Sequence, residues 1–158
     1  MKIAVFRTRN GPHRTLPPVW LLLSIGTMGV LHRFLPGPVV FPASLRWSGV
    51  VVSVLGVAVV VGTARSFRRA RTTIRPYEVP EVLLRGGLYR YSRNPIYLGM
   101  VIMLLGMGMW LGTATPWAVV PAFGAVISRR FIRMEERMLE AQFGDEYRKY
   151  RREVRRWV

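Results

Sequence analysis

Two stretches of this sequence combine side chains that could bind a charged small molecule. The first, residues 86–99, reads GGLYRYSRNPIYLG, and the second contains two adjacent acidic residues, Glu135 and Glu136. Tyrosine rings attract cations, arginine binds carboxylates through paired hydrogen bonds, and carboxylates accept hydrogen bonds from ammonium or hydroxyl groups. The first stretch offers such groups at Tyr89, Tyr91, Arg93, Asn94 and Tyr97. Both stretches are therefore candidates for a binding site.

Part of the first stretch has a structural explanation. Gly86 and Gly87 permit a turn, and Pro95 suits the first position of a helix. The proline also keeps Asn94 out of helical geometry, so we expect Asn94 to cap that helix. The tyrosines exceed what a helix start requires, but tyrosine also anchors proteins at a membrane interface. Taken alone, the stretch leaves anchoring and a functional site both open.

The acidic pair lies on a helix that we expect to begin at Ser128 and to end at Gly144. Apolar residues recur at helical spacing on one face of it and arginines on another. Adjacent side chains on a helix point about 100° apart, so we expect one of Glu135 and Glu136 to face inward. The alternative is that both pair with arginines of the same helix on an ordinary charged surface. A second short helix is expected directly after Gly144, lying against the membrane or the middle loop.

The elements that must carry these residues are membrane helices. The chain has 158 residues, of which 51% are hydrophobic. Its uncharged runs cover residues 17–31, 47–64 and 96–128. The last run, of 33 residues, would form a helix of about 50 Å, whereas a hydrocarbon core is about 30 Å thick. It must therefore fold back, near Gly112 and Pro116, and we expect two short helices over residues 95–111 and 116–128.

The basic residues favour four spans. Of the 24, four precede the first run, two lie in the next loop, eight lie in residues 65–94, none lies in the turn at Gly112, and ten follow Ser128. Because basic residues concentrate on the cytoplasmic side, both termini and the middle loop are expected there. All eight acidic residues fall on the same side. The predicted fold is all-α, an integral membrane protein with about four transmembrane helices, the last two a hairpin, and an amphipathic cytoplasmic C-terminal helix.

We expect a single domain over residues 1–158, with two spans in residues 1–64 and the functional half in residues 65–158. The absence of cysteine excludes cysteine-based sites, and the two histidines make metal ligation an unfavoured expectation. Gly108 and Gly112 form a small-xxx-small pair, which predicts close approach of the hairpin helices. The size and the arginine content favour a bacterial inner membrane, and no cleavable signal peptide is evident.

The two stretches extend to longer patterns. The first reads L-x-x-G-x-Y-R-x-x-R-N-P-x-Y-x-G, and after the predicted hairpin the second reads E-E-x-x-L-x-x-x-F-G-x-E-Y-x-x-Y. In this order, over residues 73–157, they resemble the superfamily of isoprenylcysteine carboxyl methyltransferases and phospholipid methyltransferases. The resemblance implies a membrane enzyme that uses S-adenosylmethionine. It implies a cofactor pocket formed by Glu81, Val82, Leu83, Leu84, Tyr89, Asn94, Pro95, Ile96, Tyr97 and Glu135.

The side chains suit the cofactor that the resemblance implies. Glu135 could bond its ammonium group or ribose, tyrosine faces suit its sulfonium, and the apolar residues 82–84 suit its adenine. Methyl transfer requires mainly positioning, with little acid or base help. The superfamily often has histidine where this chain has Asn94, so a titrating base at that position is not expected.

The acceptor stays open between two chemical classes. Arg130 or Arg133 could orient an isoprenoid carboxylate, whereas Glu136 could take a proton from a lipid amine. These three residues are the catalytic candidates. A lipophilic acceptor would enter sideways from the membrane, while the cofactor enters from the cytoplasm. Membrane lipids are the expected partners, and nucleic acid is not.

Other functions stay open beside methyl transfer. A non-enzymatic membrane protein could bind anionic lipid through its arginines. An NADPH-dependent reductase related to the membrane sterol reductases is a second alternative, because those proteins have a similar arginine-x-proline-x-tyrosine segment, although they are usually much longer. A family member that has lost its activity is a third.

Overall fold

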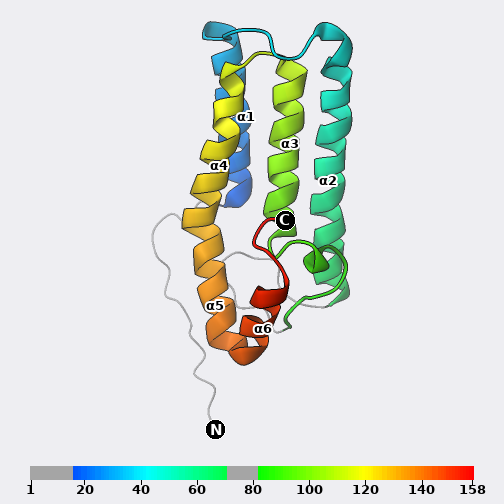
Figure 1. Ribbon diagram of the computed structural model, residues 1–158, viewed down its shortest axis with the longest axis vertical. Helices are drawn as coiled ribbons and strands as arrows, with labels where there is room; N and C mark the ends of the chain where they lie inside the picture. The colour runs from blue at the N-terminus through cyan, green and yellow to red at the C-terminus, as the bar shows by residue number, and fades with distance from the viewer. Residues whose placement is uncertain (1–15, 71–81) are drawn as a thin grey trace.

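The computed structural model describes residues 16–70 and 82–158, and in these ranges the chain is helical (Figure 1). The helices are α1 (Pro17–Phe34), α2 (Arg46–Arg69), α3 (Pro95–Leu111), α4 (Val119–Ile127), α5 (Arg133–Phe143) and α6 (Asp145–Glu153). Short 3-10 turns cover Ala43–Leu45, Gly87–Arg90 and Thr115–Ala118, and a π-helical turn covers Ser128–Ile132. Within the described part, the extended pairing is one bridge, between Val39 and Thr113. The all-α prediction is confirmed.

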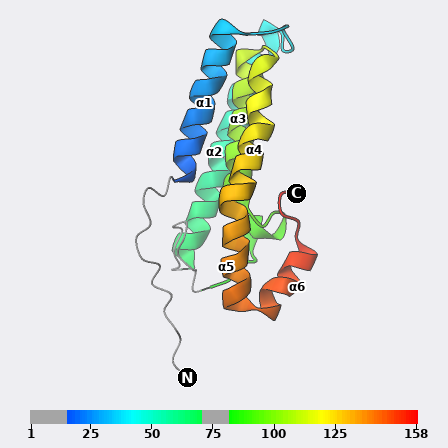
Figure 2. The same ribbon diagram turned by 90° about the vertical axis from the view of Figure 1, so that its left-hand side faces the viewer.

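The helices stand side by side along the long axis of the molecule. α1, α2, α3 and the rod formed by α4 and α5 run roughly parallel in two views at right angles (Figures 1 and 2). At one end, the loop between α1 and α2 bonds to the turn between α3 and α4, where the N–H of Val40 donates to Gly112 (2.9 Å) and that of Ala114 to Pro38 (3.0 Å). At the other end, α6 folds back beside α5. The loop of residues 82–94 and the C-terminus therefore meet at this second end.

The hairpin in the long uncharged run is confirmed. α3 has the predicted bounds, and Gly112 ends it in the left-handed conformation, at φ 77°, which favours glycine. The expectation of separate helices before and after Ser128 is wrong, because α4 and α5 continue into one another through the π-helical turn Ser128–Ile132. No proline or glycine interrupts that stretch, so the backbone has no reason to break there.

The closest helix contact is between α2 and α3. A methyl group at Gly56 would lie 2.7 Å from the carbonyl oxygen of Gly99, and one at Gly49 would lie 2.5 Å from that of Gly106. Real Cβ atoms do not approach so closely. The seven-residue spacing within each helix therefore forms a matched pair of glycine contacts, which brings the two backbones together.

The prediction for Gly108 and Gly112 is only partly right. Gly108 does pack tightly, since a methyl group there would lie 3.1 Å from the ring of Trp117 in the turn before α4. Gly112, however, ends α3 and lies against Phe41 of the loop between α1 and α2 and against Arg46, the first residue of α2. The hairpin of α3 and α4 thus uses one small residue, and the pairing that holds two helices closely lies elsewhere.

The apolar surface fits a bilayer. Among the described residues, one helix, Ala43–Arg69, is long and apolar enough to cross a membrane, and Pro95–Leu111 is a shorter apolar helix. Large apolar side chains are exposed along α1 and α2, including Leu22, Leu23, Val51, Val54 and Leu55. In water such a surface would be an aggregation hazard, whereas in a bilayer it contacts acyl chains. The core lies between the helices and contains Met28, Met100, Leu104, Phe123, Ile127 and Ile132.

The glycine contact makes a testable prediction. Gly106→Ala would place a methyl group against Gly49 and Ser53, so it should destabilise the protein by about 1–3 kcal/mol, the usual cost of overpacking. Gly124→Ala in α4 is the control, because a methyl group there meets nothing within 4 Å. Thermal unfolding in detergent would measure both. Equal unfolding temperatures for the two variants would contradict the close packing of α2 and α3.

Candidate functional site

The start of α3 places the first candidate side chain. Gly87, at φ 60°, allows the turn that leads into this segment, and Pro95 is the first residue of the helix. Two residues later, Tyr97 is buried and its ring lies 6.4 Å from that of Phe131. The first turn of α3 therefore points toward the rod of α4 and α5.

Glu135 meets Tyr97 from the other side. The Tyr97 hydroxyl donates to Oε1 of Glu135 across 2.6 Å, the short distance typical of a bond to a carboxylate. Glu135 lies in the first turn of α5, just after the π-helical turn Ser128–Ile132. Such a turn holds more residues than an α-helical one, so it shifts the register of everything that follows. It thus helps to set which residues of α5 face α3.

The surroundings of Glu135 disfavour its charge. Burial raises the pKa of this carboxyl from 4.5 to about 7, the Tyr97 hydrogen bond opposes that rise, and the nearby Glu136 adds to it. In the described part of the chain, Glu135 forms no ion pair. A half-buried carboxylate whose charge is disfavoured, and which has a hydroxyl donor but no cation among the described residues, is suited to a cationic or hydroxyl-bearing ligand.

Glu136 has the opposite environment. Its Oε1 lies 3.1 Å from Nη1 of Arg93 and accepts from Nε of Arg156 at 3.0 Å, while its Oε2 accepts from Nη2 of Arg156 at 2.6 Å. The side chain of Arg93 is itself 8% exposed. The expectation that one glutamate of the pair faces inward is confirmed for Glu136, which is buried, while Glu135 is half-buried and turns toward Tyr97. The alternative of pairing within α5 is wrong for Glu136, whose partners come from a loop and from the C-terminal segment.

Asn94 does not cap α3 through its side chain. It precedes the helix with non-helical backbone angles, as expected, but no side-chain capping bond forms. Instead its Nδ2 donates to the carbonyl oxygen of Arg156 at 3.0 Å, and its backbone N–H donates to Oγ of Ser92 at 3.1 Å. The side chain is thus used to hold the C-terminal segment, which sequence reasoning did not predict.

The tyrosines divide between the site and the surface. Tyr89 accepts, through its carbonyl oxygen, a 2.7 Å bond from the Tyr150 hydroxyl of α6. Burial raises the pKa of Tyr89 above its ordinary value, and Tyr150 and Glu135 add to that rise, so the phenol keeps its proton. Tyr91, by contrast, is 72% exposed. Of the two surfaces expected for α6, the membrane or the middle loop, the contacts of Tyr150 and of Tyr147, whose hydroxyl accepts from Arg93 at 3.2 Å, support the middle loop.

The remaining expected pocket residues lie around these contacts. Leu83 and Leu84 are half-buried and Val82 is exposed, just before the turn at Gly87. Within the described ranges, the N–H groups of residues 82–84 donate to no carbonyl. Pro95 is buried and Ile96 packs on the core. Glu81 lies outside the described residues.

The two arginine candidates lie on the outer side of the rod. Arg130 is exposed in the π-helical turn, with its guanidinium 5.2 Å from the centre of the Trp20 ring of α1. Arg133 is exposed at the start of α5, and its carbonyl accepts from Nε of Arg137 at 3.2 Å. The structure thus brings Tyr97 and Glu135 together, whereas both arginine side chains are exposed at the surface.

Comparison with known proteins identifies the family of the chain. The sequence profile of the family described as "Phospholipid methyltransferase" matches residues 45–146, which is more than half of the chain and includes both Tyr97 and Glu135. The chain belongs to the phospholipid methyltransferase family. The resemblance noted in the sequence is therefore confirmed, and membership supports methyl transfer to a lipid-like acceptor.

Two relatives match parts of the chain. An uncharacterized protein of Haemophilus influenzae is 44% identical over 63 residues, which cover 40% of this chain and the whole of that protein. The Protein-S-isoprenylcysteine O-methyltransferase of Schizosaccharomyces pombe is 37% identical over 76 residues, which cover 46% of this chain but 31% of that enzyme. The match with the second relative thus spans less than a third of its length.

Arg156 is the residue of this region that sequence reasoning missed. It holds Glu136 from a position twenty residues away, and the family match ends before it, at residue 146. Its one available signal was its position in a basic tail that contains several other arginines. Charge alone could not single it out.

The raised pKa of Glu135 predicts a pH dependence of stability. A carboxyl whose pKa is higher in the folded protein binds its proton more tightly there, so stability is greatest below about pH 4.5 and falls as the pH rises through about 7. Glu135→Gln cannot ionise. Relative to this variant, the wild type should lose up to about 1.4 kcal/mol per pH unit in that window.

Denaturant unfolding in detergent between pH 4.5 and 8 measures this loss, with the exposed Glu153→Gln as the control. The control should follow the wild type throughout. Parallel curves for the wild type and Glu135→Gln would refute the burial of an ionisable Glu135.

Proposed function

We propose that this protein transfers a methyl group from S-adenosylmethionine to a lipid-like acceptor at the cytoplasmic face of a membrane. The observation that carries the proposal is the Tyr97–Glu135 pair: a half-buried carboxylate, bonded at 2.6 Å to a tyrosine and paired with no cation in the described structure. Family membership supplies the reaction class. Membership of this family also leads us to expect S-adenosylmethionine as the cofactor.

The residues present fit the cofactor. Glu135 would accept from its ammonium group or ribose hydroxyls, because among the described residues the carboxylate has a hydroxyl partner and no cation. The N–H groups and apolar side chains of residues 82–84 would hold adenine, and the half-buried Tyr89 and the buried Tyr97 would offer ring faces to a cation. Glu81, Asn94, Pro95 and Ile96 complete the proposed pocket. Asn94 contributes its position and its hold on the C-terminal segment.

The bound cofactor would supply an electrophilic methyl group. The protein's own part is to bind, orient and exclude water, because a displacement of this kind needs chiefly alignment. Glu136 is engaged on both oxygens by arginines, so we assign it a structural role in place of proton transfer. A carboxylate acceptor would need no base. An amine would have to arrive deprotonated.

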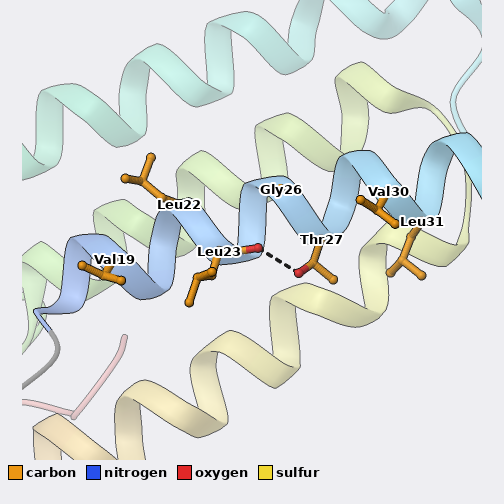
Figure 3. A pocket seen from close by; sticks show the side chains of 7 residues that line it. All are labelled: Val19, Leu22, Leu23, Gly26, Thr27, Val30 and Leu31. Carbon is orange, nitrogen blue, oxygen red and sulfur yellow. Dashed lines mark hydrogen bonds between the residues drawn. The ribbon is translucent and has the colours of Figure 1, made fainter. Parts of the chain in front are cut away.

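The acceptor would approach from the membrane. We propose four spans, formed by α1, α2, α3 and α4, with both termini and residues 70–94 in the cytoplasm of a bacterium, as the basic residues indicate. An open apolar groove of about 530 Å³ runs along α1 between Val19 and Leu31 (Figure 3). Its Val19 end adjoins Trp20, over which Arg130 lies. A lipid chain in this groove would bring an anionic or polar head toward Arg130 and Arg133.

The first experiment is calorimetric titration of S-adenosylmethionine and, separately, NADPH into the detergent-purified protein. The wild type should bind the methyl donor. Glu135→Gln should bind it at least about tenfold more weakly, because a charged hydrogen bond is lost, and Tyr97→Phe several-fold more weakly. Tyr91→Phe, which alters an exposed tyrosine of the same stretch, should bind like the wild type.

Absence of donor binding by a folded wild type would refute the cofactor assignment. Binding of NADPH in its place would indicate a reductase, and binding of neither would indicate a lipid-binding protein. Equal weakening by Tyr91→Phe and Tyr97→Phe would show that the pair with Glu135 is not the cofactor site.

The groove on α1 makes a separate prediction. Methyl groups at Gly26 and Gly29 meet nothing within 4 Å, so leucine fits at either position, but only Gly26 lines the groove. Gly26→Leu should raise the KM for a lipid acceptor by about tenfold, because it fills space that an acyl or prenyl chain would occupy. Gly29→Leu should not.

Labelled methyl transfer to phosphatidylethanolamine vesicles and to N-acetyl-S-farnesylcysteine would measure the effect on both acceptor classes. Cofactor affinity should be the same in the two leucine variants. Equal KM values would exclude this groove as the acceptor's route.

A further inference from the structure

The last residues of the chain are attached to the loop that begins α3. The N–H of Arg93 donates to the carbonyl oxygen of Arg155 at 3.0 Å. Two side chains, Ser92 Oγ at 3.4 Å and Asn94 Nδ2 at 3.0 Å, donate to the carbonyl oxygen of Arg156. Three consecutive loop residues are thus bonded to two consecutive residues of the C-terminal segment.

The same segment also closes an ion cluster. Glu136 receives Arg93 from the loop and a two-pronged contact from Arg156, at 3.0 and 2.6 Å. Trp157, the next residue, packs on the apolar core. A bidentate arginine–carboxylate pair fixes orientation as well as distance, so it is more than a loose surface contact. The backbone on either side of Arg156 is therefore anchored, by the bond of Arg155 to the loop and by the packing of Trp157. Arg156 itself binds the loop through its carbonyl oxygen and Glu136 through its guanidinium.

We propose that Arg156 is a positioning residue of the cofactor site, which fixes the start of α3 and neutralises Glu136 beside the Tyr97–Glu135 pair. The cofactor part rests on the proposed function. The proposal goes beyond it, because the family match ends at residue 146, before Arg156, whose guanidinium is bonded to Glu136. The C-terminal segment, residues 154–158, thereby becomes a working part of the site.

The electrostatic argument follows from adjacency. The negative charge of Glu136 disfavours ionisation of its neighbour Glu135. Two guanidinium groups on Glu136 offset that charge. The titratable and charged groups that act on Glu135, directly or through its neighbour, are Tyr89, Tyr97, Glu136, Arg93 and Arg156. Loss of Arg156 leaves Glu136 with one cation, so Glu135 should hold its proton to a higher pH.

The test compares neighbouring arginines. Arg156→Gln and Arg155→Gln remove the same charge one residue apart, but the Arg155 side chain is exposed and takes part through its backbone carbonyl. Arg156→Lys keeps the charge and loses the bidentate geometry. The first readout is the affinity for S-adenosylmethionine between pH 6.5 and 8.5, reported as the ratio of each variant to Arg155→Gln. The second is hydrogen exchange of residues 92–98 without cofactor.

Arg156→Gln should bind the cofactor about fivefold more weakly at pH 7, the fall in ionised Glu135 that an upward shift of about one pKa unit produces. The deficit should shrink by pH 8.5. Exchange of the Arg93 amide should rise, since its acceptor is no longer held. Arg156→Lys should restore the pH profile while leaving exchange intermediate. If Arg156→Gln does not fold, Arg156→Lys is used for the test. Its cofactor affinity should then depend on pH as in the wild type, while the exchange of its Arg93 amide should be faster than in the wild type.

A deficit equal to that of Arg155→Gln, or one that is independent of pH and not rescued by lysine, would overturn the positioning role. Unchanged exchange in Arg156→Gln would overturn the hold on α3. A wild type that binds no cofactor would refute the proposed function, and exchange alone would then decide whether Arg156 fixes the start of α3.

Discussion

The hydrogen bond between Tyr97 and Glu135 is the contact on which this end of the protein depends. It joins the first turn of α3 to the first turn of α5 across 2.6 Å, so small errors in either helix would break it. The backbones of α2 and α3 are brought together by glycine at four positions, which limits sliding of α3. The π-helical turn before α5 sets the register of Glu135. Packing in the apolar half thus determines geometry in the polar half.

Two adjacent glutamates behave differently because their partners differ. Glu136 has two arginines and is a fixed charge, whereas Glu135 has a hydroxyl and a pKa near 7. A site that binds a cation gains from such an arrangement, since the uncompensated carboxylate is stabilised only when the ligand arrives. Pairing Glu135 with a resident arginine would make the apo protein more stable but would remove the reason to bind. In the proposed site, Glu136 therefore holds the loop and the C-terminal segment in place, while the neighbouring Glu135 is left to bind the ligand.

The sequence was sufficient to predict most helices and turns, but it did not predict which side chains contact one another across the fold. The bounds of α3, the turn at Gly112, the end of α5 at Gly144 and the presence of α6 followed from proline, glycine and helical periodicity, which act locally. The continuity of α4 with α5 did not, because a π-helical turn leaves no signal in composition. Nor did the role of Arg156, since one arginine among many is selected only by the fold. The contact of Asn94 with the C-terminal segment was missed for the same reason. An asparagine before a proline is expected to cap the helix that follows, but here its side chain donates to the distant carbonyl oxygen of Arg156.

The arrangement also accounts for why the site lies at the end of the bundle. A carboxylate deep in hydrocarbon would be too costly to ionise, and one in water would be compensated by solvent and would gain little from a ligand. Glu135 lies between these limits, half-buried in the first turn of α5, beyond the apolar stretch of α4 and the π-helical turn Ser128–Ile132. There its charge is disfavoured by a few kcal/mol at most, which a ligand's cation can offset. A water-soluble cation and an apolar acceptor can meet only at such a boundary, so the position of the pair restricts the function as strongly as its chemistry does.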